Sequence, residues 1–119
     1  MIRISRLMKS FQYAFRGLLK VFKEEQNLRV QLIFGLFAIS LGVFYKLVSW
    51  EWSVLLIVIM TVFLMEIANS AVERVTDVLK PRINTYVKEI KDIMAAAVML
   101  ASFFALIIGI IIFIPHIFN

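Results

Sequence analysis

Four polar side chains recur at helical spacing near the middle of the chain. They lie three, four and four residues apart, at Glu66, Asn69, Glu73 and Asp77. On one α-helix these residues fall within about 60° of one another and form a single polar stripe. Such a row of oxygen ligands can hold a hard divalent cation such as Mg²⁺. One of its carboxylates can also act as a general base toward a substrate hydroxyl.

The stripe begins where an apolar run ends. Only 13 uncharged residues separate Trp52 from Glu66, so a membrane span of about 20 residues must continue past Glu66. A carboxylate near a membrane is costly unless it is paired, protonated or bound to a cation, which makes it a functional candidate. The alternative is a structural network in which the carboxylates pair with Arg74, Lys80 or Arg82.

The elements that position the stripe are those of a small membrane protein. The chain has 119 residues, of which 62% are hydrophobic, against about 45–50% in soluble domains. A soluble domain of this length cannot bury so much apolar surface, and disorder requires low hydrophobicity. The lack of cysteine in the sequence excludes disulfides and thiolate metal sites. We therefore predict one all-α membrane domain over residues 1–119.

Four helical segments are predicted. Residues 2–28 carry one apolar and one basic stripe at steps of three and four. That pattern is typical of an amphipathic helix on a membrane surface, although a plain membrane anchor is an alternative. Membrane spans are predicted at about 30–48, 52–79 and 92–115. The last of these contains 23 uncharged residues in a row, which is long enough to cross a bilayer.

The distribution of charge predicts the orientation of the spans. Net charge is +5; seven basic and two acidic residues precede Gln31, and segment 74–92 has five basic and three acidic residues. The positive-inside rule then places the N-terminus and segment 74–92 in the cytoplasm and the C-terminus outside. Aromatic residues typical of the opposite interface stand at Tyr45, Trp50 and Trp52. A basic arm on a membrane protein favours anionic lipid headgroups or a nucleotide over nucleic acid.

These charges favour phosphoryl transfer. Glu24 and Glu25 stand at the cytoplasmic end of the first span and could add a metal ligand at the level of the stripe. Phosphoryl transfer relies mainly on positioning and on stabilising phosphate oxygens by metal ions and cations. The phosphate loop G-x-x-x-x-G-K-[ST] is absent from the sequence, so a kinase of this kind uses side chains on helices. His116, at the outer C-terminus, is predicted to have no catalytic role.

The segment that carries the stripe resembles a family signature. Its residues from Glu66 to Asp77 fit E-x-x-N-[ST]-A-x-E-x-x-x-D, the signature of the prokaryotic diacylglycerol kinase family, which includes the undecaprenol kinases. The resemblance covers nearly the whole chain, from about residue 3 to residue 115. Three further motifs agree in order and spacing, namely Tyr13-Ala-Phe-Arg16-Gly17-Leu18, Glu25-x-x-x-Arg29, and Lys91-Asp92 followed by Ala95-Ala96-Ala97.

This resemblance implies an enzyme. It implies a homotrimer with three transmembrane helices and one surface helix per protomer. It also implies transfer of the γ-phosphate of MgATP to a lipid hydroxyl at the cytoplasmic interface. By motif position, Glu66 would be the general base and Asn69 would orient the reacting groups. Glu25 and Glu73 would hold Mg²⁺ together with the ATP phosphates.

The resemblance also assigns residues to the nucleotide. Lys91, Arg6 and Tyr13 would contact ATP, and Asp92 would lie near it. Asp77 would support the same polar network. The backbone of one short segment would border the adenosine, around Arg82, Ile83 and Asn84.

Two questions stay open at this level. Intramembrane carboxylates such as Glu66 and Glu73 would also serve a non-enzymatic carrier coupled to protons or cations. A carrier needs polar groups that continue across the membrane, whereas here the charges collect at one face, which favours the lipid kinase. The lipid itself is either diacylglycerol or undecaprenol, because both present a primary hydroxyl at the interface.

Overall fold

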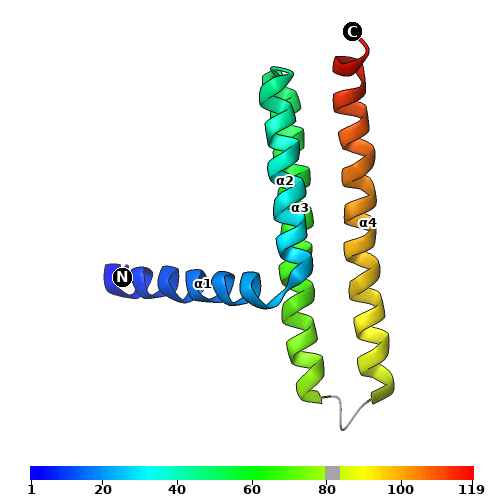
Figure 1. The fold of residues 1–119 in the computed structure, drawn as a ribbon. Coiled ribbons are helices and arrows are strands. Elements are labelled where there is room, and N and C mark those ends of the chain that lie inside the picture. The colour runs from blue at the N-terminus through cyan, green and yellow to red at the C-terminus, as the bar shows by residue number, and fades with distance from the viewer. Residues whose placement is uncertain (80–83) are drawn as a thin grey trace.

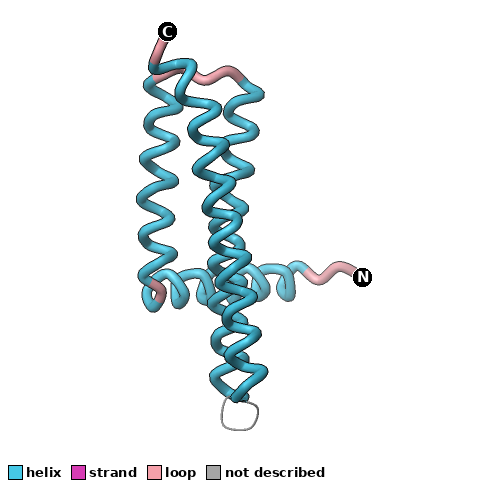
Figure 2. Tube along the Cα trace, turned by 90° about the vertical axis from the view of Figure 1, so that its right-hand side faces the viewer, coloured by secondary structure: helices cyan, strands magenta, loops and turns pink. Residues whose placement is uncertain are grey.

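The structure, a computed structural model, describes residues 1–79 and 84–119. Its helices are α1 (Ile4–Glu24), α2 (Gln26–Phe44), α3 (Ser49–Leu79) and α4 (Asn84–Ile117). Figure 1 shows α2, α3 and α4 running lengthwise, while α1 lies crosswise at the beginning of α2. Figure 2, turned by 90°, shows the same crosswise course of α1. The end of α3 and the beginning of α4 extend past the level of α1, at the end of the molecule opposite the C-terminus.

Three of these helices are long and apolar enough to cross a membrane. They are α2 with 19 residues, α3 with 31, and the part of α4 over Thr85–Ile117 with 33. A helix of 19 residues is about 28 Å long, close to the hydrocarbon thickness of about 30 Å. α3 and α4 are long enough to extend beyond that layer. The predicted all-α membrane architecture with three spanning helices is confirmed.

Several helix boundaries differ from the predicted segments. α1 ends at Glu24 and α2 begins at Gln26, so the chain turns before the predicted boundary at 28–30. α2 ends at Phe44 and α3 begins at Ser49, against predicted bounds of 48 and 52. α4 begins at Asn84, ahead of the predicted third span, which begins at 92. An apolar run marks only the membrane-embedded part of a helix, and the backbone hydrogen bonding of α4 also includes the polar residues before that run.

The turn between α1 and α2 is a single extended residue. Glu25 has φ −106° and ψ 111°, and its N–H donates to the Val21 carbonyl at 2.8 Å, which closes α1. Arg29 Nη1 donates to the Lys23 carbonyl at 2.8 Å, so a cation satisfies one of the carbonyls left over at the helix end. This turn sends α2 away from α1 and leaves Glu24 and Glu25 at the corner between the two helices.

α2 ends in a tight, hydrogen-bonded turn at its C-terminus. Leu47 N–H donates to the Gly42 carbonyl at 3.1 Å, and Lys46 N–H donates to the Val43 carbonyl at 3.3 Å. Lys46 takes the left-handed conformation, with φ 54°. This pair of bonds is the Schellman pattern, in which the left-handed residue is usually glycine. The pattern brings Leu47 back over Gly42, so the turn is packed as well as hydrogen bonded.

A small core and one polar pair join the helices at this same end. Buried side chains from the turn, α3 and α4 form the core, namely Leu47, Leu55, Ile112 and Phe113. Glu51 is only 7% exposed; it accepts a hydrogen bond from Val48 N–H at 3.1 Å and lies 2.9 Å from His116 Nε2. The pair ties the end of α4 to the start of α3, remote from the polar stripe.

Gly42 should not tolerate even one added carbon. A Cβ there would lie 2.7 Å from the Trp52 ring and 3.1 Å from Leu47, and Trp52 packs against the buried core. We expect Gly42→Ala to lower the free energy of unfolding by about 1–3 kcal/mol, because overpacking displaces neighbours. Unfolding by SDS titration of the protein in detergent micelles measures this change.

The matched control is the same substitution at Gly109. A Cβ there meets no atom within 4 Å of the protomer, so Gly109→Ala should be neutral or stabilise helix α4 by up to about 1 kcal/mol. Equal effects of the two substitutions would contradict the close approach of Trp52 to Gly42.

Candidate active site

The polar stripe lies on the second half of α3. Glu66 is 6% exposed; Asn69 and Glu73 are half-buried and Asp77 is exposed. Asn69 Nδ2 donates to Glu73 Oε1 at 3.2 Å, so these two side chains form a pair one turn apart. The Thr76 hydroxyl donates to the Glu73 carbonyl at 2.9 Å. The stripe therefore changes along its length from buried at Glu66 to solvent-exposed at Asp77.

The corner between α1 and α2 brings a further carboxylate to the stripe. The carboxyl groups of Glu25 and Glu73 both lie close enough to Glu66 to interact with it electrostatically. We call Glu25, Glu66 and Glu73 the acidic cluster. It joins the general base and the two metal ligands that the family resemblance implied, although Glu25 is 41 positions from Glu66 in the sequence.

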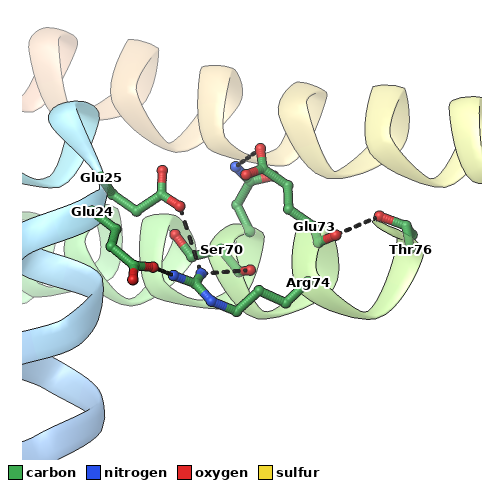
Figure 3. Close-up of polar contacts among 7 residues, drawn as sticks. Glu24, Glu25, Ser70, Glu73, Arg74 and Thr76 are labelled. Carbon is green, nitrogen blue, oxygen red and sulfur yellow. Dashed lines mark hydrogen bonds and ion pairs between the residues drawn. The ribbon is translucent and has the colours of Figure 1, made fainter. Parts of the chain in front are cut away.

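Arg74 is the cation in direct contact with this corner. Its guanidinium forms ion pairs with Glu24 and with Glu25, the latter at 3.6 Å, and donates to the Ser70 carbonyl at 3.1 Å. Figure 3 shows the guanidinium pointing from α3 toward the corner, with Glu24 and Glu25 on the facing side. The sequence placed Arg74 only in a structural alternative, and here it spans two elements.

A second ion pair joins α3 to α4. Lys91 Nζ donates to Asp77 Oδ1 at 2.7 Å. The family resemblance placed Lys91 on ATP, and the structure pairs its ammonium with Asp77 at the exposed end of the stripe. Asp92 is exposed and lines a hollow formed by α4 residues alone. Lys91 and Asp92 thus face different surroundings although they are neighbours.

The other predicted nucleotide contacts are on α1 or outside the described residues. Arg6 and Tyr13 are exposed on α1. The Arg16 guanidinium lies 6.0 Å from the centre of the Tyr13 ring, a cation–π geometry. Arg82 and Ile83 lie outside the described residues, and of Asn84 only the backbone is described, as the first residue of α4.

Similarity to known proteins identifies the family of this chain. The family described as prokaryotic diacylglycerol kinase matches residues 12–113, most of the chain. The chain belongs to the prokaryotic diacylglycerol kinase family. The family and its relatives are lipid kinases, so this chain is a lipid kinase. The family membership and the three long apolar helices together show that it is a membrane protein.

Individual relatives agree with the family assignment. Undecaprenol kinase of Bacillus subtilis (strain 168) is 29% identical over 112 residues, covering 94% of this chain and 91% of that protein. Diacylglycerol kinase of Synechocystis sp. is 31% identical over 104 residues, covering 87% of this chain and 59% of that longer protein. Diacylglycerol kinase of Helicobacter pylori is 28% identical over 99 residues, covering 83% and 77%. Both lipid alcohols therefore occur in the names of the relatives.

The acidic cluster of this kinase suits a cation that arrives with phosphates. Within residues 1–79 and 84–119, no group of three or more His, Asp or Glu side chains is arranged to hold a metal ion. Mg²⁺ in phosphate-transfer sites is usually bound by one or two carboxylates plus substrate phosphates and water. Glu25 and Glu73, which each interact electrostatically with Glu66, are the candidates for such a pair. Their oxygens fit Mg²⁺ shared with a nucleotide better than a metal site built from protein alone.

An apolar hollow adjoins the kinase's acidic cluster. It lies between α1 and α3, and its lining includes two cations, Lys20 and Arg74. Its other lining residues are small or apolar, namely Ala14, Gly17, Leu18, Val21, Ile67 and Ala71. A hollow lined by apolar and basic side chains is suited to an amphiphile with a negatively charged head.

Sequence reasoning did not assign functional roles to Ser70 or Arg74 in this kinase, and it offered Glu24 only as a candidate metal ligand, whereas Glu24 pairs with Arg74. Arg74 lies four residues after Ser70, so its bond to the Ser70 carbonyl follows from helical spacing. Its ion pair with Glu24 crosses 50 positions, and no local pattern predicts such a contact. The available signal was weaker: one cation adjacent to Glu73 within an otherwise acidic stripe.

Proposed function

We propose that this kinase transfers the γ-phosphoryl group of ATP, bound as MgATP, to the hydroxyl of a membrane lipid. The observation that carries the proposal is the nearly buried Glu66 carboxyl beside Glu25 and Glu73. A carboxylate so placed suits proton abstraction from an alcohol, and its neighbours supply the negative charge that a nucleotide-bound cation requires. The lipid is diacylglycerol or undecaprenol, the alcohols in the names of the relatives.

In this proposal the transfer is direct. The lipid hydroxyl gives its proton to a Glu66 oxygen while its own oxygen bonds to the γ-phosphorus. The bond from that phosphorus to the β–γ bridging oxygen breaks, and the bridging oxygen leaves with ADP. Glu25 and Glu73 would hold Mg²⁺ together with the ATP phosphates, and the metal would neutralise phosphate charge there. Asn69, paired with Glu73 at 3.2 Å, orients the reacting groups.

The proposal places the reaction at the cytoplasmic face of a bacterial inner membrane. α1 lies crosswise to the spanning helices (Figure 1), its residues are exposed or half-buried, and apolar side chains line one of its faces, such as Leu7, Phe11 and Phe15. As an amphipathic helix in the interface it would rest that face on the lipid and turn its basic face to headgroups and nucleotide. The lipid hydroxyl and ATP would then meet at the corner beside Glu66.

The working unit is a homotrimer in this proposal. Arg6, Tyr13 and Asp92 make no direct contact with the acidic cluster in the described part of one protomer. Large apolar side chains of the spanning helices are exposed, including Phe34, Phe103 and Ile111. A neighbouring copy can cover part of this surface and bring residues such as Asp92 to a shared site.

The carrier alternative has less support than the kinase. A groove along α2, α3 and α4 is lined by apolar side chains apart from Gln31 and Ser102. It offers no charged path toward the other end of the spans in the described residues. The family match is to kinases.

The test is phosphoryl transfer by the purified full chain in lipid nanodiscs. With radiolabelled ATP and Mg²⁺, we expect label in a lipid phosphate when diacylglycerol or undecaprenol is supplied, and loss of that product when EDTA removes Mg²⁺. The ratio of initial rates with the two alcohols identifies the lipid. Lack of labelled product with either alcohol, in protein that retains its helical circular dichroism, would overturn the proposal.

A further inference from the structure

Arg74 links α3 to the corner between α1 and α2, and few other contacts hold α1 against α3. Its guanidinium reaches from α3 to the corner and pairs there with Glu24 and Glu25 (Figure 3). α1 contributes no buried residue to the core. The crosswise position of α1 against α3 therefore depends on few contacts, and the Arg74 bridge stands at its fixed end.

The geometry of the bridge requires a guanidinium. One side chain contacts oxygens of three residues, the carboxylates of Glu24 and Glu25 and the Ser70 carbonyl at 3.1 Å. A guanidinium offers five donors in a planar fork, whereas a lysine ammonium is a compact point charge on a flexible stem. Nη1 donates to the Ser70 carbonyl on the same helix and also pairs with Glu25, while Nη2 pairs with Glu24.

The charges around Arg74 explain why the corner needs it. The negative charges of Glu25 and Glu73 both act on Glu66, so the three carboxylates repel one another. The Arg74 guanidinium, 3.6 Å from Glu25, offsets part of this repulsion by its positive charge. The closer partner is Glu24. Glu24 thus anchors the guanidinium and leaves the Glu25 carboxylate able to bind a second cation.

We infer that Arg74 is a positioning residue of the phosphoryl-transfer site, which fastens the corner to α3 and thereby holds Glu25 beside Glu66 and Glu73. The inference rests on the proposed function for its purpose, but the fastening itself rests on the ion pairs of Arg74 alone. Arg74 touches neither the lipid hydroxyl nor the phosphorus in this assignment. It acts through Glu25, which would share Mg²⁺ with Glu73.

The fastening is tested without nucleotide or lipid substrate. The chain has no cysteine, so spin labels at Gln12→Cys on α1 and Val78→Cys on α3 report one α1–α3 distance by pulsed electron paramagnetic resonance in nanodiscs. Dilution with unlabelled chain removes distances between copies. We expect a narrow distribution in the parent and a broad one in Arg74→Ala. Lys9→Ala, which removes a cation from the exposed face of α1, should leave it narrow.

A charge exchange keeps the test valid if Arg74→Ala folds poorly. Glu24→Arg alone should broaden the distribution, and Glu24→Arg combined with Arg74→Glu should narrow it again, because the opposite pair can re-form across the same gap. An Arg74→Ala distribution as narrow as the parent's, or failure of the exchange to restore it, would overturn the inference.

A second readout separates positioning of Glu25 from general loss of structure. Arg74→Ala should raise the Mg²⁺ concentration for half-maximal activity about tenfold, as loss of a residue supporting a metal ligand does, with little change in KM for the lipid. Arg74→Lys should recover only part of this effect. An unchanged Mg²⁺ requirement would overturn the role toward Glu25. A parent chain without kinase activity would instead contradict the proposed function, and the distance experiment would still decide the fastening.

Discussion

Replacing Glu66 by glutamine is expected to lower the rate of phosphoryl transfer by about 10²–10⁴-fold, the usual contribution of a general base. The amide has the size of the carboxyl but cannot take the proton of the lipid hydroxyl. Glu66 is 6% exposed, so solvent cannot easily replace it as proton acceptor. Initial rates at saturating ATP, Mg²⁺ and lipid measure the effect.

The matched control for Glu66→Gln is Glu89→Gln. Glu89 is exposed on α4, outside the acidic cluster, and undergoes the same chemical change. It should keep the parent's rate, and both variants should keep the parent's circular dichroism. A Glu66→Gln enzyme with an unreduced rate would refute the assignment of Glu66 as base, while leaving the family membership untouched.

Replacing Glu73 by glutamine should raise the Mg²⁺ requirement by about 10–100-fold. Glu73 Oε1 accepts from Asn69 at 3.2 Å, and a glutamine oxygen can accept the same bond. The substitution therefore removes the negative charge that a cation needs and leaves the hydrogen-bonded pair in place. The rate measured against free Mg²⁺, at fixed ATP and lipid, gives the half-saturating concentration.

Two comparisons make the Glu73 experiment specific. Glu89→Gln should keep the parent's half-saturating Mg²⁺ concentration, since it removes a charge remote from Glu66. At saturating Mg²⁺, Glu73→Gln should recover a large part of the parent's rate, because this variant loses only affinity for the cation. Glu66→Gln should not recover, because it lacks the general base. A Mg²⁺ dependence that matches the parent's would exclude Glu73 as a metal ligand.

Local patterns were sufficient for the spanning helices and for the stripe. The length of an apolar run reports directly whether a segment can cross a bilayer, so three spanning helices followed from the sequence alone. Spacings of three and four place residues on one helix face whatever the rest of the chain does. Glu66, Asn69, Glu73 and Asp77 accordingly share α3, and the Asn69–Glu73 pair is within one turn.

Contacts between different helices could not be predicted from local sequence patterns. Arg74 pairs with Glu24 across 50 positions, and His116 pairs with Glu51 across 65. Each contact depends on where a turn ends one helix and on how far the next helix is rotated about its axis, and neither quantity has a periodic signature. For the same reason the sequence predicted only that His116 has no catalytic role, and it did not predict that His116 helps to hold the end of α4.

The residue types, their spacing and the run lengths were enough to indicate a membrane kinase whose carboxylates lie at one end of its helices. Only the folded chain decided that the charge of Glu25 acts on Glu66, and that Arg74 joins this corner to α3. The physical reason is that helix formation and membrane insertion are governed by neighbours along the chain. The meeting of Glu24 and Glu25 with Arg74 depends instead on the one extended residue that turns the chain between α1 and α2.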